Sequence, residues 1–223
     1  MKNNETLQQE VEDAIKWEPL LHAAEIGVTV KEGVVTLTGI VDSYAKKSEA
    51  EDAAKKVAGV KAVLERIEVK YLGSIHKEDE EIAKEVLNAL KWNWQVPGEK
   101  IKVKVEDGWI TLSGTINWNY QKDAAKNAVK NLLCVKGVTN NITIESDIHD
   151  AVEKKEIESA IGRNWSINDQ NIQVKVSGNR VTLTGTVNSI YQKDEALRMA
   201  WNAPGVWFVD NELEIEYDYL LVD

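Results

Sequence analysis

The residues suited to catalysis or metal binding are few, and their spacing matches no known reactive arrangement. The three histidines, His22, His76 and His149, share no equivalent positions in the repeat described below, and none has the spacing of a zinc-protease motif. The sequence contains no glycine-rich phosphate-binding motif, and its carboxylates form no distinctive pair. We therefore predict a protein that is not an enzyme and that holds neither a metal nor another cofactor.

The single cysteine, Cys134, allows two interpretations. Its thiol could act as a nucleophile, yet Gly59 and Gly205 occupy the equivalent positions elsewhere in the chain. A free cysteine usually behaves as a small apolar residue, so we expect Cys134 to be a buried packing residue. One cysteine also excludes an internal disulfide and a multi-cysteine zinc site.

Composition indicates a folded, acidic protein. The chain has 223 residues, of which 43% are hydrophobic, and its formal net charge is −10. Such a chain is a poor candidate for binding nucleic acid, because phosphate contacts need clustered lysine and arginine. It has no run of eighteen apolar residues, and residues 1–14 lack the apolar core of a signal peptide. We expect a cytoplasmic protein that could lie at the periphery of a membrane.

An internal repeat dominates the sequence. One motif occurs as VVTLTG at Val34, WITLSG at Trp109 and RVTLTG at Arg180. A second follows in register, as GVKAVLERIEV, CVKGVTNNITI and GVWFVDNELEI. The constant offsets predict three tandem domains over residues 1–71, 78–146 and 151–218, joined by linkers near residues 71–77 and 146–152.

Each repeat predicts the same order of elements. Leu7, Val11 and Ile15 form a helical stripe that recurs in the second repeat and, more briefly, in the third. Two alternating segments follow, then an alanine-rich helix and a last alternating strand. The hairpin turn between the two segments holds Gly33, Gly108 or Asn179, residue types that tolerate positive φ. We predict an α+β fold of three α-β-β-α-β units, each a three-stranded mixed sheet with two helices on one face.

The order of elements and the pattern Gly-Val-x-x-Val-x-Asn-x-Leu-x-Ile at Gly205–Ile215 resemble the BON domain, a transport-associated family named after osmotically inducible proteins. The resemblance covers nearly the whole chain. It implies a binding module that attaches to phospholipid surfaces in an osmotic or envelope stress context. The first repeat departs from the pattern, with Glu65 in place of Asn140 and Asn211.

The eight tryptophans are the most informative side chains for function. Several occupy positions where a sister repeat has a charged or hydroxyl residue, which indicates that they point away from their own core. A candidate lipid or partner surface in the second repeat comprises Trp92, Trp94, Trp109, Trp118, Lys102, Lys104 and Lys122. A candidate inter-domain or oligomer surface comprises Trp201, Trp207, Trp17 and Trp165.

Two explanations for these tryptophans remain open at this stage. They could anchor contacts between units or between copies of the chain, as in a cytoplasmic protein–protein scaffold. They could instead sit at the headgroup level of a phospholipid membrane. Charge favours the second repeat for lipid contact, because residues 72–147 carry ten basic and eleven acidic side chains, whereas residues 148–223 carry seven and thirteen.

One lysine recurs at the start of the second helix of each repeat, as Lys47, Lys122 and Lys193. A cation near a helix N-terminus opposes the helix dipole, so helix stability does not explain its placement. It could pair with a carboxylate or meet an anionic headgroup.

Overall fold

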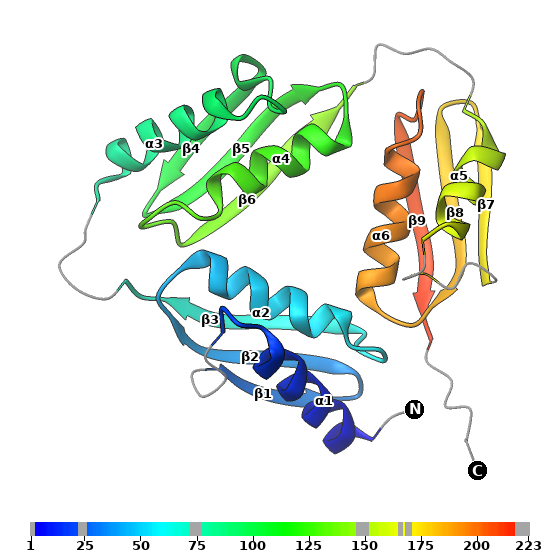
Figure 1. Ribbon diagram of the computed structural model, residues 1–223, viewed down its shortest axis with the longest axis horizontal. Coiled ribbons are helices and arrows are strands. Elements are labelled where there is room, and N and C mark those ends of the chain that lie inside the picture. Colours follow the sequence, from blue (N-terminus) through cyan, green and yellow to red (C-terminus); the bar gives the residue numbers. More distant parts are fainter. Residues whose placement is uncertain are drawn as a thin grey trace. The chain divides into compact units, whose positions relative to one another are not determined.

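The computed structural model describes residues 3–21, 26–71, 77–145, 152–164, 167 and 171–216. These residues form three units with the predicted order of helix, strand, strand, helix and strand (Figure 1). Unit 1 contains α1 (Asn4–Trp17), β1 (Ile26–Lys31), β2 (Val34–Val41), α2 (Tyr44–Lys56) and β3 (Ala62–Val69). Unit 2 contains α3 (Asp79–Trp92), the short 3-10 helix η2 (Gly98–Lys100), β4 (Ile101–Glu106), β5 (Trp109–Ile116), α4 (Asn119–Val129) and β6 (Gly137–Ile144). Unit 3 contains α5 (Lys154–Gly162), β7 (Ile172–Ser177), β8 (Arg180–Val187), α6 (Ile190–Trp201) and β9 (Phe208–Ile215).

Each unit has a mixed sheet with its second strand in the centre, as predicted. In unit 2, β4 pairs antiparallel with β5, while β6 pairs parallel with β5 and places Trp109 beside Gly137. Unit 3 has the same pairings, with Arg180 beside Phe208. The parallel pairing follows from the crossover through the second helix, which returns the chain to the end where the central strand began.

Both helices of a unit lie on one face of its sheet (Figure 1). Along β5, Ile110, Leu112 and Ile116 are buried against them, while the alternate side chains reach the open face. The first helices bury the predicted stripes, Leu7, Val11 and Ile15 in α1 and Ile82, Val86 and Leu90 in α3. Buried side chains thus recur at every second residue of the strands and at every third or fourth residue of the helices, and they form a single core in each unit.

The glycine that ends the first repeated motif is required by a close backbone contact. Gly114 has φ 137°, and a Cβ there would overlap the carbonyl oxygen of Lys100. Gly185 has φ 116° and the same relationship to the carbonyl oxygen of Asn171. Any side chain at these positions would push the first strand of the sheet away from the second.

The hairpin turns differ between units in a way the sequence did not predict. Gly33 and Gly108 have positive φ as expected, and a Cβ on Gly108 would lie 2.7 Å from the carbonyl oxygen of Cys134. The prediction is wrong for Asn179, because in the hairpin turn of unit 3 the residue with positive φ is Gly178. The Asn179 side-chain amide instead donates a 2.6 Å hydrogen bond to the carbonyl oxygen of Gly205, the residue equivalent to Cys134.

Among the described residues, no helix combines the length and the apolar character needed to cross a membrane. Within the same ranges, no cluster of three or more histidine, cysteine, aspartate or glutamate side chains could hold a metal ion.

Candidate functional site

The first helices of units 1 and 2 each end in a tryptophan that is almost fully exposed. Trp17 ends α1 with 87% of its surface exposed, and Trp92 ends α3 with 86% exposed. Each lies two residues after the last buried member of its stripe, Ile15 or Leu90, a step of about 200° around a helix. The packing of the helix against the core therefore also directs the indole away from the core.

Trp94 is displayed by a short segment that is itself anchored. Its side chain is 89% exposed, although Val96, two residues later, is buried. The Asn93 side chain accepts a hydrogen bond from the backbone N–H of Gln95 at 3.0 Å, and the Val96 N–H bonds to the Asn93 carbonyl. An aromatic side chain held on an ordered segment loses less conformational entropy when it meets a partner than one on a loose segment.

The segment that carries Trp94 is joined to the start of α4. Lys100 Nζ donates a 3.1 Å hydrogen bond to Oδ1 of Asn117, the residue before Trp118. Trp118 is half-buried and stacks on Tyr120, with the ring centroids 6.5 Å apart. Lys102 is exposed on β4 opposite Ser113, near the C-terminal end of β5.

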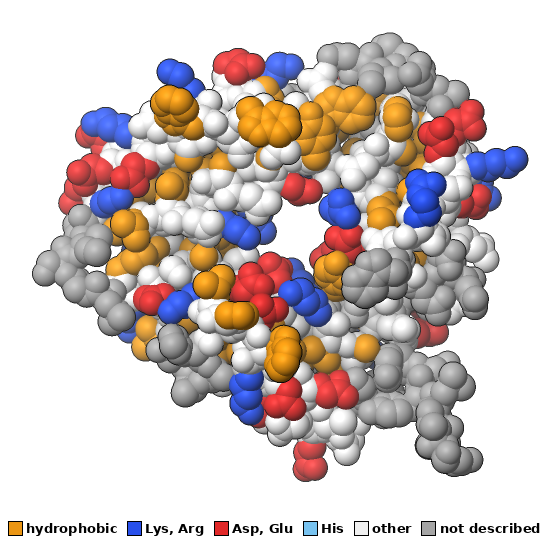
Figure 2. Space-filling model, viewed as in Figure 1, with side chains coloured by type: hydrophobic (Ala, Val, Ile, Leu, Met, Phe, Trp, Pro, Cys, Tyr) orange, Lys and Arg blue, Asp and Glu red, His pale blue; other side chains and the backbone are white. Residues whose placement is uncertain are grey.

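We call the group of Trp92, Trp94, Lys100, Lys102 and Trp118 the tryptophan end of unit 2. Its members come together because the end of α3 leads to the start of β4, which pairs with the end of β5. On the face drawn in Figure 2, apolar side chains reach the surface near the end of α3, with charged side chains among them. The contact between Lys100 and Asn117 joins positions seventeen residues apart, and residue spacing alone does not predict it.

Three members of the predicted surface, Trp109, Lys104 and Lys122, are not part of the tryptophan end. Trp109 begins β5 beside the hairpin and is paired with Glu106, while Lys104 forms a 2.8 Å ion pair with the same glutamate. Since β5 extends from Trp109 to Ile116, Trp109 lies about 23 Å along the strand from the end that leads to Trp118. Lys104 lies between them, two residues after Lys102 on β4. The structure therefore places Trp109 at the opposite end of the sheet from Trp92, Trp94 and Trp118.

Trp109 has a local structural role. Its side chain is 49% exposed, and its ring lies over Gly137 of the neighbouring strand. In unit 3 the same pair of positions holds Arg180 and Phe208, whose guanidinium and ring lie 5.0 Å apart. Both units thus have an aromatic contact across the parallel strand pair. The aromatic residue lies on the central strand in unit 2 and on the last strand in unit 3.

The recurring lysine has a partner that neither earlier explanation included. Lys193 Nζ donates a 2.6 Å hydrogen bond to the backbone carbonyl of Leu213 on β9. Lys122 is half-buried on α4, and its own carbonyl accepts a 2.8 Å bond from the side-chain amide of Asn140. In unit 3 the lysine therefore attaches the second helix to the last strand.

The second predicted surface is heterogeneous. Trp201 is half-buried and packs against the core of its own unit, contrary to the expectation that it points away. Trp207 is half-buried, and its backbone N–H bonds to the Asn179 carbonyl at 2.9 Å. Trp17 is exposed, as given above, and Trp165 lies outside the described residues, as do His22, His76 and His149.

Cys134 is buried and has φ 67°, the left-handed conformation that Gly59 and Gly205 adopt in the sister units. The residue as a whole is 7% exposed. This environment agrees with the packing role expected from the sequence.

Comparisons with known proteins place this geometry in context. A family model described as the BON domain matches residues 3–71, 78–146 and 149–217. The osmotically-inducible protein Y of Escherichia coli (strain K12) is 33% identical over 126 residues, which are 55% of this chain and 63% of that protein. The match therefore spans less than two thirds of this relative's length.

Two solved structures of CdsD, a structural protein of the type III secretion system of Chlamydia trachomatis, also match. The first, its C-terminal domain, is 19% identical and has a TM-score of 0.26, with 97% of this chain and 100% of that chain covered. The second is 19% identical with a TM-score of 0.25, covering 96% and 94%. Likenesses at this level carry no argument about fold or function.

Proposed function

Because the chain belongs to the BON domain family, we propose that it is a non-enzymatic binding module that attaches reversibly to phospholipid surfaces through the tryptophan end of unit 2. The similarity to an osmotically inducible protein supports a role in osmotic or envelope stress. The observation that carries the proposal is the exposure of Trp92 and Trp94, at 86% and 89%.

Tryptophan suits a membrane interface, because its ring is apolar and its indole N–H can still reach water or a headgroup. Two such side chains on a folded surface need a counter-surface, since exposed apolar groups favour association. Lys100 and Lys102 supply positive charge beside them, which an anionic leaflet attracts.

The test is co-sedimentation of the full chain with vesicles of phosphatidylglycerol and phosphatidylcholine, and of phosphatidylcholine alone, at low and physiological salt. We expect binding to the anionic vesicles that weakens with salt and shifts tryptophan emission to the blue. Replacing both Trp92 and Trp94 by alanine should weaken binding at least about tenfold, because the buried apolar area is lost.

The matched control is Phe208→Ala, which removes a 55% exposed aromatic residue from unit 3 and should leave vesicle binding unchanged. Urea unfolding of all variants separates lost binding from lost folding. Absence of vesicle binding in the parent chain would overturn the proposal. If, in addition, sedimentation velocity showed an oligomer that the double alanine variant dissolves, these tryptophans would serve a protein scaffold instead.

A further inference from the structure

A groove of about 470 Å³ runs along α5 beside the end of α6 in unit 3. Its floor is apolar, with Ile157 and Ala160 contributed by α5 and Met199 and Ala203 from α6 and the turn after it. This volume lies in the range of sites that hold small molecules. Methionine at the floor favours adaptable packing, because its thioether chain is unbranched and flexible.

Two cations stand on the rim of this groove. Lys155 and Arg163 both line it, and they lie eight residues apart on α5, about 12 Å along the helix axis. Neither forms an ion pair with any residue that the structure describes. Two other cations of the unit are paired, since Lys154 contacts Glu158 at 3.2 Å and Arg198 contacts Glu195 at 2.7 Å.

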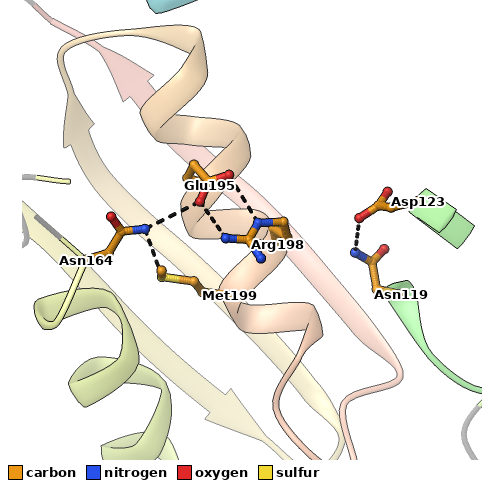
Figure 3. A network of polar contacts seen from close by, with 6 residues as sticks. All are labelled: Asn119, Asp123, Asn164, Glu195, Arg198 and Met199. Atoms are coloured by element: carbon orange, nitrogen blue, oxygen red, sulfur yellow. Dashed lines mark hydrogen bonds and ion pairs between the residues drawn. The ribbon is translucent and has the colours of Figure 1, made fainter. Parts of the chain in front are cut away.

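A polar network beside the groove joins Glu195, Arg198 and Met199 of α6 to Asn164, which follows α5 (Figure 3). Arg198 holds the Glu195 carboxylate through Nε at 3.1 Å and through a terminal nitrogen at 2.7 Å. Asn164 donates to the same carboxylate at 3.4 Å and lies 3.9 Å from the Met199 sulfur. The network thereby holds Met199, which lines the groove, and occupies the Glu195 carboxylate with Arg198 and Asn164.

The rim also contains one acid, Glu156, so the groove carries two cations and one anion. This local excess of positive charge contrasts with unit 3 as a whole, where residues 148–223 have seven basic and thirteen acidic side chains. Arg163 occupies the position that holds Trp17 in unit 1 and Trp92 in unit 2. Unit 3 thus presents a cation where its sister units present an exposed indole.

We propose that this groove binds a free, single-chain anionic amphiphile, with a carboxylate on Arg163 and an aliphatic chain on the floor formed by Ala160, Met199 and Ala203. A guanidinium matches a carboxylate through two parallel hydrogen bonds, which gives the head a defined orientation. Lys155, about 12 Å from Arg163 along the helix axis, is too far away to contact the same head, and its attraction for the carboxylate is largely screened. The 12 Å between the cations suits a medium-length chain, and the apolar floor excludes a fully polar anion.

The proposal is tested by isothermal titration calorimetry of the full chain with decanoate below its micelle concentration. We expect one site per chain with a Kd of about 1 mM, the strength typical of a ligand of this size. Decyltrimethylammonium, which has the same chain length and a positive head, should not bind. Arg163→Gln should weaken decanoate binding about fivefold, and Glu156→Gln should strengthen it about twofold, because these groups are exposed.

Lys154→Gln is the matched control, since it removes one positive charge from the same helix at a residue already paired with Glu158. It should leave the affinity within error. Ser159→Leu places a bulky chain at the groove and should abolish binding without affecting folding, because Ser159 is exposed. The proposal is overturned if decanoate fails to bind, if Arg163→Gln binds as tightly as the parent, or if the cationic amphiphile binds equally well.

Discussion

The hydroxyl of Ser189 accepts a 3.2 Å hydrogen bond from the backbone N–H of Gln192 and so caps α6, whereas Trp118 occupies the same position at the start of α4. In unit 1 the equivalent Ser43 accepts a bond from the N–H of Lys46 at 3.4 Å. An indole can only donate, so Trp118 cannot satisfy the helix N-terminus in this way. In unit 2, α4 therefore lacks the side-chain cap that the second helices of the sister units have. The residue at its cap position, Trp118, belongs to the tryptophan end.

We expect Trp118→Ser to stabilise unit 2 by about 1 kcal/mol, because serine restores the side-chain cap. The free energy of unfolding from urea denaturation measures the gain. The same variant should bind anionic vesicles more weakly if the tryptophan end is the attachment site. Ser189→Ala is the opposite control and should destabilise unit 3 by a similar amount; an unchanged stability in both variants would contradict the capping argument.

A second prediction concerns the asparagine of the last strand. The Asn211 amide donates to the Lys193 carbonyl at 3.0 Å, and its Oδ1 accepts from the Leu213 N–H at 3.3 Å. We expect Asn211→Ala to cost about 1–3 kcal/mol, because two backbone groups lose their partner. Asn211→Asp keeps the acceptor and loses the donor, so urea denaturation should place it between the parent and the alanine variant.

Unit 1 provides a natural comparison for this position, because Glu65 accepts the Ile67 N–H at 2.6 Å there. A carboxylate can thus provide the acceptor of the asparagine but not its donor. If Asn211→Asp were as unstable as Asn211→Ala, the bond to the Leu213 N–H would carry none of the stabilisation.

A third prediction follows from the left-handed backbone of Cys134, at φ 67°. An L-residue in this conformation costs about 1–2 kcal/mol relative to its preferred regions, and glycine avoids the steric part of that cost. We expect Cys134→Gly to stabilise unit 2 by up to about 1 kcal/mol, after the small loss of side-chain burial. Cys134→Val should be destabilising, because branching at Cβ is poorly tolerated at positive φ. Thermal unfolding of the two variants should move the midpoint in opposite directions.

The sequence predicts most of this fold, because the repeat allows each position to be compared with the equivalent positions in the two other units. Apolar spacing such as Leu7, Val11 and Ile15 identifies the helices, and the constant offsets align the strands. What it did not predict depends on non-local geometry. One example is the bond between Lys193 and the Leu213 carbonyl, and another is the location of Trp109 and Trp94 at opposite ends of unit 2. Both follow from how the strands pair and in which direction the helices run, and the pattern of residue types along the chain does not contain this information.

The last prediction concerns pH and the ion pair at the start of α2. Lys46 Nζ lies 2.9 Å from Oδ2 of Asp42, and its hydrogen bond and charge hold the pKa of that carboxyl below its ordinary value of 3.8, against the opposing effect of burial. A carboxyl with a lowered folded-state pKa stabilises the fold above about pH 4 and loses this contribution as the pH falls through the folded value.

We expect Asp42→Asn to lower the free energy of unfolding by a few tenths of a kcal/mol at pH 7, since the pair is partly exposed. The difference from the parent should vanish toward pH 2, where both chains are uncharged at this position. Urea denaturation across pH 2–7 checks this, with Asn117→Ala in unit 2 as a control whose effect should not change in the same way. A constant difference between Asp42→Asn and the parent at every pH would show that the Asp42 charge does not contribute to stability.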